Sequence, residues 1–222
     1  MQRHFDEELR QLKDKLFKMG LLVEEAVRKS IQALIKRDSK LAQEITEQDQ
    51  KINILEIEID EVSHELIALR QPTAVDLRFI TMVLKINSNL ERIGDQAVNI
   101  AEKAMALNKE TPLKSYLSIP QMADIAIAMV KESLDAFVAR DAQKAKQICE
   151  RDDELDTLND EIYNSLQTAV KKNEIEVSQA VSLIMVAHNL ERIGDLGTNI
   201  AEDVIYLAKG IDIRHHISER RE

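Results

Sequence analysis

The sequence contains few cysteine, proline, glycine and aromatic residues. Its 222 residues include one Cys, three Pro, five Gly and no Trp, and aromatic residues make up 3%. The single Cys149 cannot form an internal disulfide, which suits a reducing compartment. Because Pro and Gly are the residues that interrupt helices, long helices can run unbroken. The composition therefore predicts an all-α protein whose core is built from aliphatic side chains and Met.

Basic residues are outnumbered, with 30 Lys and Arg against 40 Asp and Glu, and long apolar runs are missing. The formal net charge of −10 argues against binding to nucleic acid or to anionic lipid surfaces, since both require a basic face. The first ten residues, MQRHFDEELR, are charged from the third position, and no apolar run approaches the ~18 residues of a membrane span. We therefore expect a cytosolic protein without membrane insertion.

Familiar catalytic motifs are missing as well. The sequence contains no Gly-rich phosphate loop, no nucleophile elbow and no HExxH, and its one ExxH, at 61–64, has no second copy to make the pair found in helical di-iron proteins. These absences favour a binding or regulatory protein over an enzyme.

A long internal repeat organises the chain. The segment NLERIGDQAVNIAE at 89–102 recurs as NLERIGDLGTNIAE at 189–202, displaced by 100 positions. Solenoid units repeat every ~20–50 residues, so this period indicates two copies of a small domain. The prediction is a tandem duplication of two antiparallel three-helix bundles, with residues 1–112 as the first domain and 113–222, including a short C-terminal tail, as the second.

Apolar residues spaced by three and four positions indicate three long helices in each copy. Pro72 stops the second helix, and the segment from Asn108 to Pro120 holds the other two prolines and predicts a linker. The predicted helices run approximately over 4–36, 40–70, 74–107, 121–139, 142–172 and 175–209.

The repeated helix carries a stripe of oxygen-bearing side chains. On a helix that turns about 100° per residue, Glu91, Asp95 and Asn99 fall at about 0°, 40° and 80°, away from the apolar face. The second copy draws the same stripe with Glu191, Asp195 and Asn199. Each repeated helix therefore presents acidic side chains on one side and core residues on the other.

The preceding helices should supply further carboxylates at the same height. In an antiparallel hairpin, residues equally distant from the turn stand level with each other. Asp49 and Asn53 should then face Asp95 and Glu91 in the first copy. In the second copy, the residues expected to face Asp195 and Glu191 are Asp152 and Asp156.

Two interpretations of these acidic clusters stay open at this point. Oxygen ligands on two helices suit Mg, Mn, Ca or ferric iron, and zinc only if a His such as His188 joins. An acidic stripe on a helical protein is otherwise commonly a solvated face. The metal interpretation is favoured by the fact that both copies keep the stripe residues in register while most flanking residues differ.

Several segments together resemble the PhoU family of bacterial phosphate-specific transport regulators. They are HFDEEL at 4–9, Met19-Gly20, QPTAVDLRFI at 71–80 and the two NLERIGD…NIAE helices. The resemblance implies an elongated pair of three-helix bundles, commonly a homodimer, whose ExxxD motifs hold Fe, Mn, Mg or Zn ions on the surface. It places these motifs on Glu91, Asp95, Glu191 and Asp195, with acidic partners at Asp49, Asp152 and Asp156. Asn53 stands where the second copy has Asp156, so the first site has one charge fewer.

The resemblance also implies a function. Members of this family act as negative regulators of the phosphate-starvation response and of phosphate uptake. They are expected to link the ATPase subunit of the phosphate ABC transporter to a membrane sensor histidine kinase. A metal-dependent phosphohydrolase that uses the paired carboxylates to activate water is the alternative, and a helical scaffold that binds no ion is a third hypothesis.

Overall fold

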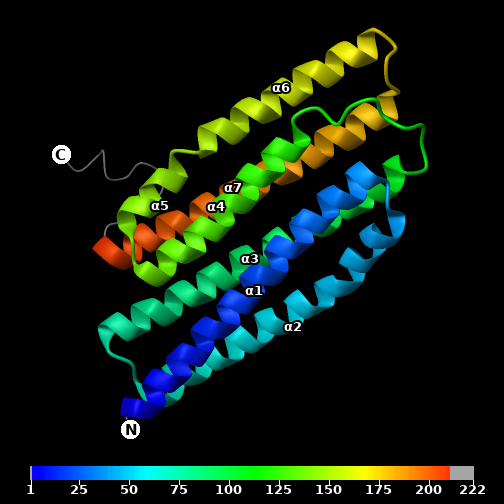
Figure 1. Ribbon diagram of the computed structural model, residues 1–222. Helices are drawn as coiled ribbons and strands as arrows, with labels where there is room; N and C mark the ends of the chain where they lie inside the picture. Colours follow the sequence, from blue (N-terminus) through cyan, green and yellow to red (C-terminus); the bar gives the residue numbers. More distant parts are fainter. Residues whose placement is uncertain (1, 211–222) are drawn as a thin grey trace, which may run out of the picture.

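The computed structural model describes residues 2–210, which form seven α-helices and no strand; the predicted C-terminal tail, residues 211–222, lies outside the described range. The helices build two antiparallel three-helix bundles (Figure 1), which confirms the predicted all-α class. The first bundle contains α1 to α3, and in the second α5 and α6 together take the place of α2. The bounds are α1 (Gln2–Lys36), α2 (Ser39–Arg70), α3 (Ala74–Leu107), α4 (Ile119–Ala139), α5 (Ala142–Cys149), α6 (Asp152–Lys171) and α7 (Val177–Lys209).

Equivalent turns join the first two helices of each bundle. Arg37 and Arg140 both adopt positive φ, at 56° and 51°, and end α1 and α4. The side chain of Asp38 then accepts hydrogen bonds from the first backbone N–H groups of α2, and Asp141 does the same for α5. A side-chain oxygen at this position satisfies N–H groups that have no partner within the helix. The repeated Arg-Asp pair therefore specifies both turns.

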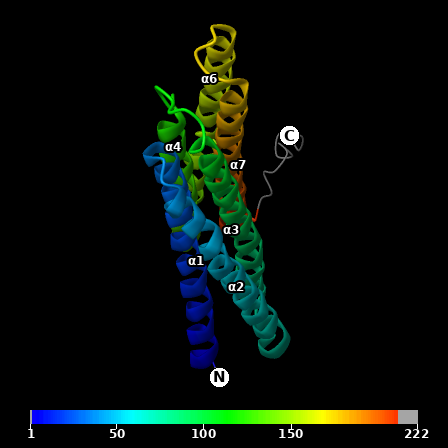
Figure 2. The same cartoon turned by 90° about the vertical axis from the view of Figure 1, so that its right-hand side faces the viewer.

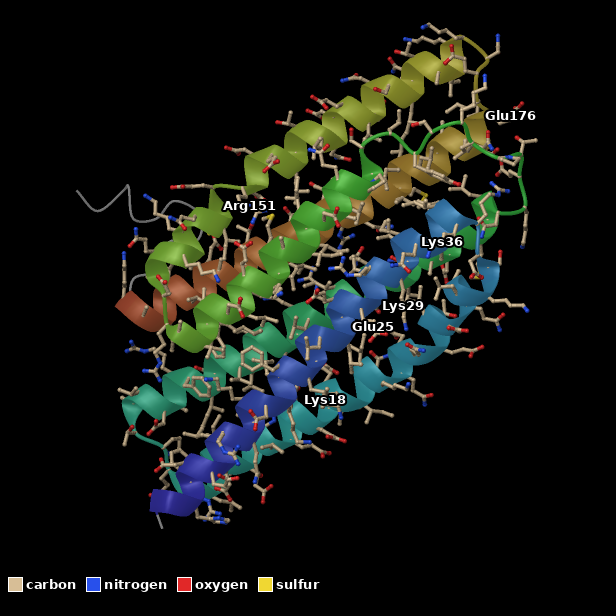
Figure 3. All side chains as sticks on the ribbon, viewed as in Figure 1. Lys18, Glu25, Lys29, Lys36, Arg151 and Glu176 are labelled. Carbon is tan, nitrogen blue, oxygen red and sulfur yellow. The ribbon has the colours of Figure 1, made fainter. Side chains whose placement is uncertain are left out.

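The prediction of one unbroken helix over 142–172 was wrong. The helix is interrupted between Cys149 and Asp152, where Arg151 forms an ion pair with Glu132 of α4 at 3.2 Å. Figure 3 shows Arg151 at this break. The new helix α6 begins with Asp152, Asp153 and Glu154, and acidic residues are stabilised by the positive end of the helix dipole. This acidic run favours a new helix start over continuation of α5.

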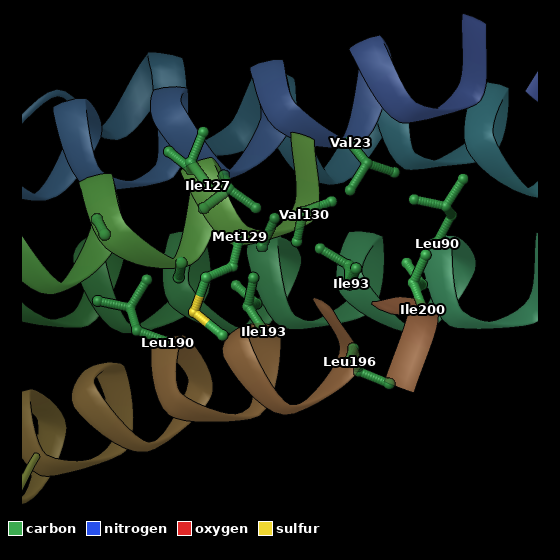
Figure 4. Close-up of a cluster of buried hydrophobic side chains, with 14 of the residues drawn as sticks. Val23, Leu90, Ile93, Ile127, Met129, Val130, Leu190, Ile193, Leu196 and Ile200 are labelled. Atoms are coloured by element: carbon green, nitrogen blue, oxygen red, sulfur yellow. The ribbon is translucent and has the colours of Figure 1, made fainter. Parts of the chain in front are cut away.

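The two bundles lie side by side and share one core. Helices α3 and α7 pack against each other through the middle of the elongated molecule (Figure 2), and α1 packs against α4. Ile93 of α3, Ile193 of α7 and Met129 of α4 are fully buried in the same cluster (Figure 4). At the edge of this seam, the ring of Phe79 stacks on that of Phe137 with centroids 5.2 Å apart. The two repeats therefore pack directly against each other.

Gly20 lies at the contact between α1 and α4. A Cβ at this position would lie 2.4 Å from Leu134 Cδ1, and α1 continues through the glycine as a helix. Of the two explanations that a mid-helix Gly suggests, a bend or a close approach, the structure shows the close approach.

The first helix of the second bundle is shorter than its counterpart in the first bundle. The helices α1 and α4 end at equivalent Arg residues, yet α1 has 35 residues and α4 has 21. Residues 108–118 connect the bundles beside the missing turns of α4. Arg37 donates hydrogen bonds to the carbonyl oxygens of Asn108 and Glu110, and Gln179 of α7 donates one to Thr111 O. Side chains from both bundles therefore anchor the linker.

An ion pair across the seam gives a first prediction. Lys85 Nζ of α3 lies 3.1 Å from Asp203 Oδ1 of α7, with side chains 40% and 7% exposed. Lys85→Met leaves a buried carboxylate without its partner, and we expect it to lower the free energy of unfolding by about 2 kcal/mol. Asp203→Asn leaves a lysine that water can still reach, so its cost should be about 1 kcal/mol or less. Urea unfolding measures both, and equal losses would contradict this account.

Candidate functional site

The first acidic cluster lies between α2 and α3. Gly94 of α3 lies against α2, because a Cβ there would lie 3.2 Å from Ile52 Cδ1 and 3.5 Å from Asp49 Oδ1. Asp49 therefore stands beside the helical turn that carries Glu91 and Asp95. Asn53 Nδ2 donates a hydrogen bond of 2.8 Å to Asp49 Oδ2. The remaining side-chain oxygens of Asp49 and Asn53 are buried and have no hydrogen-bond partner in the protein.

Burial and mutual repulsion both raise the carboxyl pKa values in this cluster. Burial first, and then the neighbouring Asp95, raises the pKa of Glu91, with Glu56 and Asp49 adding to the rise. Burial and Asp49 raise the pKa of Asp95. Glu56, whose own pKa is raised by burial and by Asp60, belongs to the same group although the sequence analysis did not include it. Its position seven residues, or two turns, after Asp49 was the available signal.

The second acidic cluster lies between α6 and α7. Burial, then Asp195 and Asp156, raise the pKa of Asp152. Burial, then Glu191 and Asp156, raise the pKa of Asp195. His188 Nδ1 stands 3.0 Å from Glu191 Oε2, so the histidine extends this cluster by one turn of α7. The structure thus brings together Asp152, Asp156, Glu191 and Asp195.

Four other residues lie at the end of the acidic stripes or beside the second cluster. Asn99 and Asn199 lie one turn beyond Asp95 and Asp195, with exposed side chains. Thr198, which the sequence analysis missed, donates a hydrogen bond of 3.3 Å to Asp152 Oδ1. Cys149 also borders this cluster, and burial, followed by the charges of Glu202 and Asp152, raises the pKa of its thiol to about 12.

The family comparison matches both copies of the repeat. The family model described as the PhoU domain matches residues 16–104 and 119–204. The chain belongs to the PhoU family. This membership confirms the resemblance that the motifs suggested. The two matched ranges leave out the first turns of α1, which have no counterpart in α4.

Relatives within the PhoU family match the chain over nearly all of its length. A "Phosphate-specific transport system accessory protein PhoU homolog" of Aquifex aeolicus is 41% identical, covering 97% of this chain and 98% of the relative. A relative of the same description from Pseudomonas putida is 39% identical and covers 96% of this chain and 84% of the relative. Among solved structures, PhoU from Pseudomonas aeruginosa superposes with a TM-score of 0.89 at 38% identity, covering 93% of this chain and all of that one. The regulatory protein PhoU from Streptococcus pneumoniae gives 0.86 at 28% identity, with 94% and 98% covered.

The donors of this PhoU family member suit a hard metal ion by their chemistry. Each cluster offers carboxylate oxygens from two helices, and Asp49 contributes a buried oxygen without a partner. Over residues 2–210, however, no three His, Cys, Asp or Glu side chains are arranged to hold one ion. The donor types therefore fit a metal, while their side chains would have to rotate to converge on it. Over the same residues, no helix is long and apolar enough to cross a bilayer.

The raised carboxyl pKa values predict how stability depends on pH. A carboxyl whose pKa is higher in the folded protein stabilises it at low pH, and this contribution is lost as the pH rises through the folded pKa. With a chelator present, Asp195→Asn should therefore stabilise the protein near pH 7, and the gain should shrink toward pH ~4, near the pKa of an unperturbed Asp. Urea unfolding at both pH values measures the difference. The exposed Asp153→Asn is the control, and the same pH-dependent gain in both variants would refute the prediction.

Proposed function

We propose that this chain is a negative regulator of the phosphate-starvation response and of phosphate uptake. It acts in the cytoplasm as an adaptor between the ATPase subunit of the phosphate ABC transporter and a membrane sensor histidine kinase. The observation that carries the proposal is membership of the PhoU family over nearly the whole chain, with relatives described as phosphate-specific transport accessory proteins. The lack of catalytic motifs supports an adaptor, and we propose a homodimer as its assembly.

Metal ions are part of the proposal. The residues that would hold them are Glu91 and Asp95 with Asp49 and Asn53, and Glu191 and Asp195 with Asp152 and Asp156. Asn99 and Asn199 would contribute only from the exposed edge of each site. When bound, an Fe, Mn, Mg or Zn ion would supply positive charge that offsets the repulsion between these carboxylates. Asp156 gives the second site one carboxylate where the first has the amide of Asn53, and Glu56 adds a carboxylate beside the first site.

The adaptor role is tested by binding and by genetics. Tagged protein should retain the purified ATPase subunit or the cytoplasmic part of the kinase, and a deletion strain should express its phosphate-starvation genes when phosphate is plentiful. Normal repression in the deletion strain would count against the proposal. Elemental analysis should find metal in the wild type and less in a variant with Asp152→Asn and Asp195→Asn, and sedimentation tests the dimer.

A metal-dependent phosphohydrolase is the alternative function. The only observation that favours it is the pairing of carboxylates across two helices. The side chains of Asp95 and Asp195 are exposed, so neither cluster excludes water from a reacting group. Turnover of phosphate esters with Mn or Mg that is abolished by Asp195→Asn would favour this alternative. No turnover across a panel of metals would dismiss it.

A further inference from the structure

A groove runs between α6 and α7 next to the second acidic cluster. Its volume is about 320 Å³, and its floor is formed by Ile162, Ile184 and Ala187. Asp160, Tyr163 and His188 form its rim. The volume is at the lower end of the ~300–1,000 Å³ of small-molecule sites, so a protruding side chain suits it better than a whole ligand.

The first bundle closes the equivalent position with a hydrogen-bonded bridge. Asn87 Nδ2 of α3 donates to Glu56 O at 2.9 Å and to Asp60 Oδ1 of α2 at 2.9 Å. These bonds tie the two helices together across the gap. The bridge therefore stands in the first bundle at the position that the groove occupies in the second.

The register of the two repeats identifies what replaces the bridge. Gly94 faces Ile52, and Gly194 faces Leu155, so these two pairs are equivalent. Counting from them, Asn87 corresponds to Ala187, and Asp60 corresponds to Tyr163. Neither replacement can form the amide-to-carboxylate bond, so the groove follows from two specific sequence differences between the copies.

Exposed apolar side chains include Tyr163 of the groove and three residues on the earlier turns of α7. Tyr163 is 49% exposed, and Val177, Val181 and Met185 are 63%, 50% and 42% exposed. The last three recur every four residues and therefore share one face of the helix. In the first copy, the position of Met185 is held by Lys85, which pairs with Asp203. Contiguous exposed apolar residues of this kind mark interaction surfaces.

The surroundings of the groove are strongly acidic. The first ten residues of α6, DDELDTLNDE, contain six acidic residues and no basic one. This helix lies at the outer edge of the molecule (Figure 1), where a partner can approach it. Negative charge around an apolar floor selects a partner with positive charge around an apolar side chain.

We propose that the α6–α7 groove docks a basic segment of a partner protein, which inserts one bulky apolar side chain between Tyr163 and Ile184. The inference rests on the adaptor function and deepens it by assigning one docking face. The floor supplies burial for the inserted side chain, and Asp160 with the acidic turns of α6 steers the basic residues on either side of it.

A variant that copies the first bundle tests the groove. Ala187→Asn combined with Tyr163→Asp installs the bridge residues and should close it. This variant adds one negative charge, so a purely electrostatic attraction would strengthen its binding of basic peptides. The matched control, Ile57→Asp, adds the same charge at an exposed position of α2. Circular dichroism and thermal unfolding verify that both variants fold.

The probe is a phage-displayed library of random 12-residue peptides selected on the wild-type protein. Selected peptides should carry one Phe, Trp, Leu or Met flanked by Lys or Arg. Fluorescence anisotropy should give at least tenfold weaker binding to the closed variant, unchanged binding to the Ile57→Asp variant and a few-fold loss with Asp160→Asn. Equal binding by the closed variant, selected peptides without basic residues, or no selected peptide would each overturn the proposal.

A second measurement separates this inference from the adaptor function. The purified ATPase subunit and the cytoplasmic part of the kinase are each applied to immobilised wild-type, closed and control proteins. At least one should be retained by the wild type and the control, and at least tenfold less by the closed variant. Equal retention by the closed variant would overturn the groove but leave the adaptor role standing. If the wild type retains neither, the adaptor role fails, and the peptide selection decides on the groove by itself.

Discussion

Replacing Ile193 with alanine will lower the free energy of unfolding by about 3–4 kcal/mol and will destabilise both bundles together. Ile193 is fully buried in the cluster that joins α7 to α3 and α4. Removing three carbon atoms from such a position loses their burial and leaves a cavity. Because the cluster contains side chains from both bundles, the cavity should lower the stability of both bundles. Ile93→Ala, at the equivalent position of α3, should have a similar effect.

The distribution of tyrosines makes this prediction measurable. Tyr116, Tyr163 and Tyr206 are the three tyrosines of the chain, and all follow the first bundle. Tyrosine fluorescence therefore reports on the linker and second bundle, while circular dichroism reports on all helices. The two signals should change at the same urea concentration in the wild type and in both variants. Separate transitions would show that the bundles unfold independently, and Ile57→Ala, at an exposed site, should change stability by less than ~0.5 kcal/mol.

Much of the fold could be predicted from the sequence because its signals are local. The spacing of apolar residues gives the helices, and Pro72 and the Arg-Asp pairs give their ends. The internal repeat gives the division into two bundles. The packing of α3 against α7 is different, because Leu90 and Ile93 form one apolar stripe in the sequence whether they contact one neighbouring helix or several. That contact depends on how two finished bundles meet.

The break between α5 and α6 shows a second limit. Apolar periodicity continues from Ile148 to Leu155, so the pattern alone predicts one helix. The acidic run that starts α6 was the competing signal, and it acts through the helix dipole and not through burial. Its effect becomes evident only with the contact between Arg151 and Glu132, which joins residues of different helices.

The candidate site was predictable to the level of helix pairs. Equal distances from a hairpin turn place Asp49 beside the turn of Asp95, and this argument needs no side-chain detail. The bond from Thr198 to Asp152 and the position of Cys149 beside the second cluster depend on how the end of α5 and the start of α6 are oriented at their break. Because the apolar pattern predicts one continuous helix there, it could not supply these orientations.

Gly194 and Leu155 should show strong coupling in a double-mutant cycle. A Cβ on residue 194 would lie 2.2 Å from Leu155 Cδ1, and Leu155 is fully buried. Gly194→Ala therefore overpacks the contact at a cost of about 2–3 kcal/mol, offset by about 1 kcal/mol of improved helix propensity. Leu155→Ala removes the obstructing atoms and should cost about 3 kcal/mol by itself. In the double variant, the new methyl group occupies part of the emptied space, so the combined loss should be about 1–2 kcal/mol smaller than the sum.

The equivalent position of the first bundle is the control for this cycle. A Cβ on residue 94 would lie 3.2 Å from Ile52 Cδ1, so Gly94→Ala requires only a small shift and should stay within ~1 kcal/mol of the wild type. Urea unfolding of the single and double variants measures the coupling, and strictly additive losses would show that Leu155 does not limit the approach of α6 to α7. Because Asp152 lies one turn before Leu155 and Asp195 follows Gly194, the same contact fixes the separation of the two carboxylates. A coupled loss of stability would therefore identify a packing contact that positions the acidic cluster.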